Sequence, residues 1–258
     1  MNFLRNPAWI GSLTTAAPEE GPGTWVLFNT FDISNGGADG SNYSTGSANV
    51  VATCDYSQIP KVWVNADGRP GKSIRYVRDS EVFGGNHSHY RAYLQADNTY
   101  LGLGGMQTEG RVTFDVRIPP QANFRGNVFT DPQVFWFGGI IDGTTPRYIY
   151  FGFDGDSATF GLWNTTSGAF NFAANTTVAL GVQPTGWLAV DFRYRIHAST
   201  GYAWVKLGSY APLYLENQNT AAPASKTLFA MACGSLSGAA QDLTYFGSVT
   251  NVKYYTPV

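Results

Sequence analysis

The sequence is poor in charge and in long apolar runs, and each shortage excludes a class of protein. Asp, Glu, Lys and Arg make up 13% of the 258 residues, and the net charge of −2 comes with no run of Lys or Arg. Binding to a phosphate backbone needs a basic patch, so we expect no nucleic-acid partner. No apolar run approaches the roughly 20 residues that span a bilayer, so we expect no membrane insertion.

Cysteine is scarce as well, which excludes a framework of disulfides. Cys54 and Cys233 each lie within an apolar, strand-like run, and we expect two buried thiols rather than one disulfide. The first eleven residues lack the basic start, the apolar run and the small-residue cleavage site of a secretion signal, so we expect no signal-directed secretion.

Glycine and aromatic residues are abundant, and this balance is typical of a β-protein with many turns and a neutral polar exterior. The chain has 30 Gly and 15% aromatic residues. Residues 24–258 show strand-like runs separated by turn formers, and we predict one all-β domain there. Residues 1–23 lack periodicity and form a predicted arm, whose apolar residues are candidates for assembly contacts: Phe3, Leu4, Trp9 and Ile10.

Three segments alternate between apolar and polar residues, as half-buried strands do. They are residues 111–118, 187–196 and 202–207. The second and third are joined by a turn-rich link, which predicts a β-hairpin. Other runs are apolar on both faces, as expected for strands in the centre of a sandwich: 134–137, 148–153 and 159–163.

The order of these segments resembles a known framework. Gly110-Arg111 begins one strand, Phe135-Trp136 lies in the next apolar run, and residues 186–194 lead into the hairpin. This order is similar to that of concanavalin A-like proteins, which include legume-type lectins, laminin-G-like modules and β-glucanases. The resemblance spans about residues 105–258 and implies a jelly-roll sandwich of two antiparallel sheets.

The same resemblance bears on catalysis. The glucanases carry the acidic motif Glu-x-Asp-x-Glu soon after the Phe-Trp segment, because retaining hydrolysis needs two carboxylates about 5 Å apart. In this sequence, residues 137–144 hold only Asp142, within an Asp-Gly turn. We therefore predict that the protein is not an enzyme.

Two short clusters could hold a metal, and for both we favour a simpler interpretation. Asp154 and Asp156 could bind Ca²⁺ with help from carbonyl groups, but they also fit a plain hairpin turn. His87 and His89 would share one face of a strand, but no third ligand is evident nearby. We predict no metal and no cofactor.

The polar faces of the three alternating strands gather charged and aromatic residues in a chain otherwise poor in charge. The candidates for carbohydrate binding are Arg117, Trp187, Arg193, Arg195, Tyr202 and Trp204. An aromatic ring can stack on a pyranose while Arg and Asp bind its hydroxyl groups. The alternative is a ladder of cross-strand salt bridges, with arginines lying over aromatic rings, that stabilises a solvated face.

Composition and the apolar arm resemble structural proteins of bacteriophage particles, which leave the cell by lysis. Our leading hypothesis is a non-enzymatic virion structural protein, capsid-decorating or fibre-like and assembled in the host cytoplasm. Its partners would be other virion proteins or copies of itself, as a homo-oligomer, and its sandwich would contact host-surface glycan in many copies. The alternatives are a free, extracellular carbohydrate-binding lectin and a glycan-cleaving hydrolase or lyase.

Overall fold

The fold is known from a computed structural model. The structure describes residues 20–30, 51–54, 61–64, 69, 72–78, 90–96, 108–118, 134–142, 147–154, 159–166, 176–182, 184, 186–220, 226–235 and 245–258. The four apolar residues of the predicted arm lie outside these residues, as do His87, His89 and Asp156. Among the residues that the structure describes, no helix is long and apolar enough to cross a membrane.

All regular structure in the described residues is β-strand. The strands of the N-terminal half are β1 (Trp25–Thr30), β2 (Val51–Cys54), β3 (Lys61–Val64), β4 (Lys72–Arg78), β5 (Tyr90–Ala96) and β6 (Glu109–Ile118). Those that follow are β7 (Val134–Asp142), β8 (Arg147–Asp154), β9 (Thr159–Thr166), β10 (Thr176–Ala179) and β11 (Gly186–Arg195). The last four are β12 (Gly201–Leu207), β13 (Leu213–Gln218), β14 (Lys226–Ser235) and β15 (Tyr245–Pro257).

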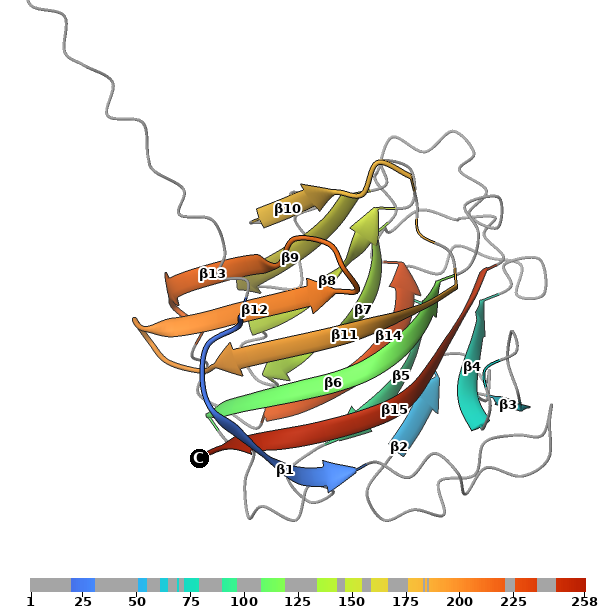
Figure 1. The fold of residues 1–258 in the computed structure, drawn as a ribbon, viewed down its shortest axis with the longest axis horizontal. Helices are drawn as coiled ribbons and strands as arrows, with labels where there is room; N and C mark the ends of the chain where they lie inside the picture. The colour runs from blue at the N-terminus through green and yellow to red at the C-terminus, as the bar shows by residue number, and fades with distance from the viewer. Residues whose placement is uncertain are drawn as a thin grey trace, which may run out of the picture.

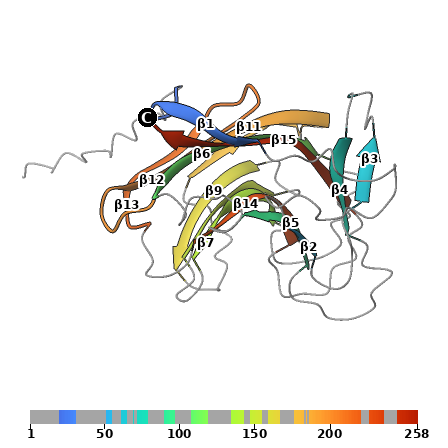
Figure 2. The ribbon, with the colours of Figure 1, turned by 90° about the horizontal axis from the view of Figure 1, so that it is seen from below.

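The strands form two antiparallel sheets that pack face to face (Figures 1 and 2). One sheet has the order β13-β12-β11-β6-β15-β4-β3, with β1 also paired to β15, and the other has the order β10-β9-β8-β7-β14-β5-β2. This arrangement confirms the predicted all-β sandwich. The last strand, β15, lies in the middle of its sheet, where it pairs with β6, β4 and β1.

The three alternating segments of the sequence form neighbouring strands. β11 pairs with β6 over its whole length, from Gly186 opposite Ile118 to Arg195 opposite Glu109. It also pairs with β12 as the predicted hairpin. Their apolar faces are buried as expected, and Val116, Phe192 and Val205 are each at most 1% exposed. These strands are consecutive neighbours in the eight-stranded sheet.

Aromatic rings join the two sheets in the core. Phe151 of β8 is fully buried, and its ring centroid lies 4.9 Å from that of Phe192 on β11 and 6.3 Å from that of Phe114 on β6. Phe160 of β9 adds an edge contact at 6.4 Å. Because each aromatic side chain buries 150–250 Å², this cluster accounts for a large part of the apolar surface removed from water.

Two buried tyrosines supply the core with a polar pair. The hydroxyl groups of Tyr194 and Tyr254 are 2.9 Å apart and bond to each other. Gly110 makes room for them, because a Cβ at this position would lie 2.6 Å from the Tyr194 hydroxyl. Burial raises the pKa of Tyr194 well above its usual range and raises the pKa of Tyr254 to about 12, so both phenols stay protonated at neutral pH.

The register of the seven-stranded sheet separates the two cysteines. Cys54 on β2 and Cys233 on β14 both lie opposite Ala92, on either side of β5. Two inter-strand spacings place their Cα atoms about 10 Å apart, which is beyond the reach of a disulfide. The thiols therefore do not pair with each other in this fold, in agreement with the prediction.

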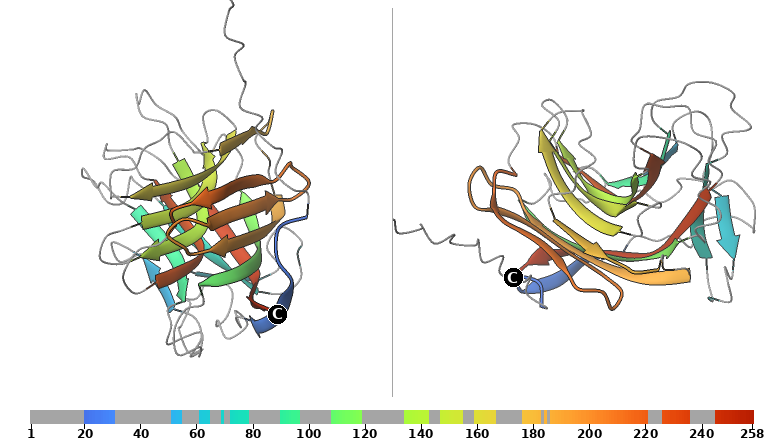
Figure 3. Two further views of the ribbon diagram at one scale, coloured as in Figure 1. Left: turned by 90° about the vertical axis from the view of Figure 1, so that its left-hand side faces the viewer. Right: turned by 90° about the horizontal axis from the view of Figure 1, so that it is seen from above.

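Both sheets are strongly curved, and the seven-stranded sheet lies on the inside of the curve (Figure 3). Its concave face points away from the eight-stranded sheet, whose outer face is convex. The molecule therefore has two different faces on which a site could form, one concave and one convex.

Candidate functional site

The convex face of the eight-stranded sheet carries arginines that lie over aromatic rings. Each guanidinium carbon is 4.8 to 5.0 Å from a ring centroid, in four pairs: Arg69 with Trp187, Arg111 with Tyr255, Arg193 with Trp204 and Arg195 with Tyr202. Three of these arginines also pair with a carboxylate within 3.0 Å, and Arg69 makes an ion pair with Asp115. This is the ladder that the sequence left as the alternative to a sugar site.

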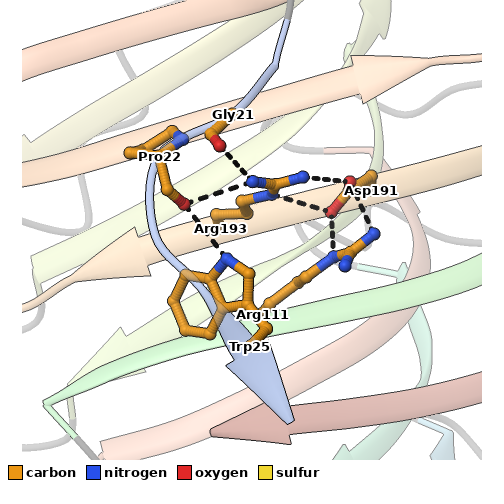
Figure 4. A network of polar contacts seen from close by, with 6 residues as sticks. All are labelled: Gly21, Pro22, Trp25, Arg111, Asp191 and Arg193. Atoms are coloured by element: carbon orange, nitrogen blue, oxygen red, sulfur yellow. Dashed lines mark hydrogen bonds and ion pairs between the residues drawn. The ribbon is translucent and has the colours of Figure 1, made fainter. Parts of the chain in front are cut away.

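Asp191 is the centre of the best-defined part of the ladder (Figure 4). Its carboxylate accepts two hydrogen bonds from Arg111, at 2.9 and 3.0 Å, and two from Arg193, at 3.4 and 3.0 Å. Arg193 is only 6% exposed, and the carboxylate between the two guanidinium groups compensates its charge. The position of Arg193 is therefore set by β6, β11 and β12 together.

A segment from the start of the described chain crosses this face and covers the part of it around Arg193 and Trp204. We call residues 20–24 the strap; it leads directly into β1 (Figures 1 and 4). Arg193 donates from Nη1 to the carbonyl oxygens of Gly21 and Pro22, the latter at 3.2 Å. The Pro22 carbonyl also accepts from Trp25 Nε1 at 3.1 Å, and the Thr24 carbonyl accepts from the Val258 amide at 3.0 Å.

Close packing fixes the composition of the strap. A Cβ on Gly21 would lie 2.7 Å from the indole ring of Trp204 and 2.9 Å from Arg193 Cζ. Gly23 has a φ of +90°, in the region that favours glycine, and a Cβ there would lie 2.6 Å from the Trp25 ring. Glycine is therefore required at positions 21 and 23, where the chain passes over the sheet.

A second cluster lies farther along the same strands. Glu109 accepts two hydrogen bonds from Arg195, at 3.1 and 3.0 Å, and a third from the Tyr202 hydroxyl at 2.7 Å. Three effects raise the pKa of Tyr202: burial, the hydrogen bond with Glu109 and the negative charge of Glu109. Together they hold the phenol in its neutral form. The hydrogen bond with Glu109 raises the pKa of Arg195. All three side chains are engaged with one another.

The remaining two sequence candidates lie opposite each other, where Trp187 on β11 faces Arg117 on β6. Trp187 is half-buried under the Arg69 guanidinium, whose carboxylate partner Asp115 also accepts from Asn251 Nδ2 at 3.1 Å. Burial lowers the pKa of Arg117. The six candidates thus form three cross-strand pairs rather than one open platform.

Three side chains of this face that the sequence predicts to be exposed are buried. Trp204 is 1% exposed, Tyr202 3% and Arg193 6%, although the sequence placed all three outward. Their side chains do point away from the core of the sandwich, but Gly21 covers Trp204, and Arg195 and Tyr214 lie against Tyr202. Arg195 is exposed, and Trp187 and Arg117 are half-buried.

Sequence reasoning missed the strap, which comes from the far end of the chain. Gly21 and Arg193 are 172 residues apart. The Gly-Pro-Gly turn followed by Trp25 was the available signal, because two glycines around a proline indicate a specific backbone path. Nothing local indicated where that path runs.

The concave sheet has few groups for acid-base chemistry. Its seven described strands contain two carboxylates, Asp142 at the end of β7 and Asp154 at the end of β8. Asp154 lies opposite Val134, at the other end of β7, which places the two carboxylates roughly 26 Å apart at 3.3 Å per residue. A retaining pair needs about 5 Å and an inverting pair about 6.5–9.5 Å.

The register places aromatic and glycine positions side by side on the concave face. Ile149 and Phe151 are buried in the core, so positions 148, 150 and 152 of β8 belong to the concave face. Gly152 lies opposite Trp136 on β7 and Gly161 on β9. In the next row, Tyr150 lies opposite Gly139 and Trp163, and Trp163 is 4% exposed.

In the part of the chain that the structure describes, no three side chains of the His, Cys, Asp or Glu type lie together as metal ligands would.

The comparisons with known proteins add information on the fold alone. No family model and no curated protein matches the sequence.

Solved structures do match. A laminarinase from Flavobacterium sp. UMI-01 has a TM-score of 0.53 at 8% identity, over 90% of this chain and 100% of that one. An endo-1,3-beta-glucanase from Streptomyces sioyaensis has a TM-score of 0.52 at 12% identity, over 93% and 99%. The potassium-bound carbohydrate recognition domain of Emp46p has a TM-score of 0.49 at 7% identity, over 91% and 100%.

The two matches above 0.5 show the fold. The protein is a jelly-roll sandwich of the concanavalin A-like kind with two antiparallel sheets, as the sequence predicts. At this level of identity the match carries no residue roles, since one fold hosts many functions.

Proposed function

We propose that this protein binds carbohydrate without cleaving it, through the concave face of the seven-stranded sheet. The observation that carries the proposal is the contrast between the two faces. Most polar groups identified on the convex face are engaged in ion pairs, ring stacking and the strap. The concave sheet has aromatic positions beside glycines, and its described strands lack two carboxylates at catalytic spacing.

The physical case rests on what a sugar chain needs. Aromatic rings stack on the apolar face of a pyranose, and a curved sheet can follow an extended glycan over several residues. Trp136 lies next to Gly152, which carries no side chain that could compete with a ligand for the neighbouring space. We place the main contact at this row, because Trp163 in the next row is buried.

Trp136→Ala should weaken carbohydrate binding by about 1–2 kcal/mol, roughly tenfold, which is the loss of one ring contact. Affinity gel electrophoresis against soluble β-glucans, alginate and capsular polysaccharide measures this. Trp187→Ala is the matched control on the convex face and should keep the affinity of the wild type. A panel without a single binder contradicts the proposal, as does an equal loss in both variants or the release of reducing ends or unsaturated products.

We further propose that the protein works as one of many copies in a virion, as a capsid-decorating or fibre-like component held by its N-terminal arm. The strap supports this arrangement, because it fixes the chain at Gly21 and Pro22 on the convex face, opposite to the proposed binding face. Many copies presented in this way would turn weak glycan contacts into strong attachment.

Replacing the four apolar arm residues Phe3, Leu4, Trp9 and Ile10 by serine should convert a trimer or larger assembly to monomer. This variant leaves residues 20–24 intact, so the strap and the sandwich are unchanged. Light scattering at micromolar concentration gives the mass of both proteins. A monomeric wild type, or an assembly that survives the four substitutions, would count against the structural role.

A further inference from the structure

The contacts between the strap and the convex face involve backbone atoms of the strap. We define the cradle as Arg193, Trp204, Asp191 and Arg111, the convex-face side chains beneath and beside the strap. Arg193 binds only backbone carbonyl oxygens of the strap, those of Gly21 and Pro22. The Trp204 ring packs against Gly21, and the strap contributes no side chain of its own to the contact with Arg193.

The cradle is built by the sheet alone. Asp191 orients Arg193 through two hydrogen bonds and is itself fixed by Arg111. The guanidinium carbon of Arg111 in turn lies 4.9 Å from the centroid of the Tyr255 ring on β15. All these groups belong to strands of the eight-stranded sheet, and their contacts with one another do not involve the strap. Preorganisation of this kind lowers the entropic cost of binding a peptide.

The contact is also selective for sequence. Gly21 is required because any Cβ would meet Trp204 and Arg193, and Gly23 is required by its φ of +90°. The Pro22 carbonyl accepts from both Arg193 and the Trp25 indole, so Trp25 helps to hold the turn. Residues 21–25 therefore contain both the backbone groups that the cradle contacts and the Trp25 ring that holds the turn.

We propose that the cradle is a peptide-docking site that can take residues 21–25 of a second copy of this chain in place of its own strap. Exchange of an identical segment between protomers is a low-cost route to linked copies, because the cradle makes the same hydrogen bonds and ring packing with either copy of the segment. In an assembly the high local concentration of copies favours it. This proposal is independent of carbohydrate binding.

The test uses the full chain with the strap disabled. In Gly21→Ala the cradle residues are unchanged, but the new methyl group prevents the strap from seating. A fluorescent peptide with the sequence of residues 19–26 should bind this variant at least tenfold more tightly than it binds the wild type, whose own strap competes. The same peptide with alanine at position 21 should bind at least tenfold more weakly, as measured by fluorescence anisotropy.

If Gly21→Ala does not fold, Gly23→Ala serves in its place, because it loosens the turn without adding an atom against the cradle. Equal binding of the two peptides, or no binding of either to a folded variant, overturns the proposal. Failure of the peptide test leaves the glycan measurements unaffected. The proposal of strap exchange can therefore be overturned without affecting the proposal of carbohydrate binding.

A second measurement asks whether a whole chain can donate the strap. Tagged Gly21→Ala serves as acceptor, and labelled Arg193→Ala, whose cradle is disabled, serves as donor. The acceptor should capture this donor at least tenfold more efficiently than a donor that carries both substitutions. All three proteins keep the same N-terminal residues. Any capture through residues 1–19 is therefore equal for the two donors. Equal capture of the two donors contradicts the exchange.

Discussion

Replacing Trp204 by alanine should lower the free energy of unfolding by about 3–5 kcal/mol, the usual cost of removing a fully buried large aromatic side chain. The ring is 1% exposed, lies 4.8 Å from the Arg193 guanidinium carbon and packs under Gly21. Its loss opens a cavity beneath the strap and removes the stacking partner of a buried charge. Urea unfolding followed by circular dichroism gives the difference.

The matched control for this substitution is Trp187→Ala on the same face and the same hairpin. Trp187 is half-buried, so its replacement should cost less than half as much. Neither substitution should change carbohydrate affinity in the folded protein. A loss below about 1 kcal/mol for Trp204→Ala would mean that the ring is in solvent, as the alternation of the sequence alone suggests.

Asp191→Ala should destabilise the protein by about 2–4 kcal/mol, because it leaves two arginines without the carboxylate between them. Arg193 is 6% exposed, so its charge would be left buried and uncompensated. The strap should loosen as well, since Asp191 orients the guanidinium that binds Gly21 and Pro22. The same urea titration measures this change.

Glu216→Ala is the control for Asp191→Ala, because Glu216 is an exposed carboxylate on β13 and its loss should lie within about 0.5 kcal/mol of zero. A double-mutant cycle with Arg193→Ala should give a coupling energy of about 1–3 kcal/mol. Additive effects of the two substitutions would show that the ion pair does not contribute as described.

Three neighbouring strands of the eight-stranded sheet, β6, β11 and β12, could be predicted because each obeys a strict period of two. Alternation in residues 111–118, 187–196 and 202–207 fixes which side chains face the core, and the structure agrees at Val116, Phe192 and Val205. The order of strands could not be predicted. β15 ends the chain but lies between β6 and β4, and no local pattern specifies a pairing over more than 130 residues.

The candidate site was predicted only as a set of residue types. Alternation correctly indicates that Trp204 points away from the core, but it cannot indicate what covers the ring from outside. That information lies in Gly21 and Pro22, 172 and 171 residues before Arg193. The distant segment covers Trp204 and Arg193, and only the three-dimensional fold reveals this contact.

The same reasoning explains why the ladder is present in a chain so poor in charge. A convex sheet face crossed by a strap needs groups that bind backbone carbonyl oxygens, and a buried arginine with a carboxylate behind it provides them. Arg111 and Arg193 pair with Asp191 on this face, and Arg195 pairs with Glu109. They leave the concave face as the one where we expect a ligand.

Hydrogen exchange of the full chain, measured by mass spectrometry with and without a polysaccharide that it binds, tests the assignment of the two faces most directly. We expect added protection in peptides from β7, β8 and β9 and none in peptides from β11 and β12 or from residues 20–30. Protection on β11 and β12 with an unchanged concave sheet would contradict the assignment, and it would return the carbohydrate site to the face that the strap covers.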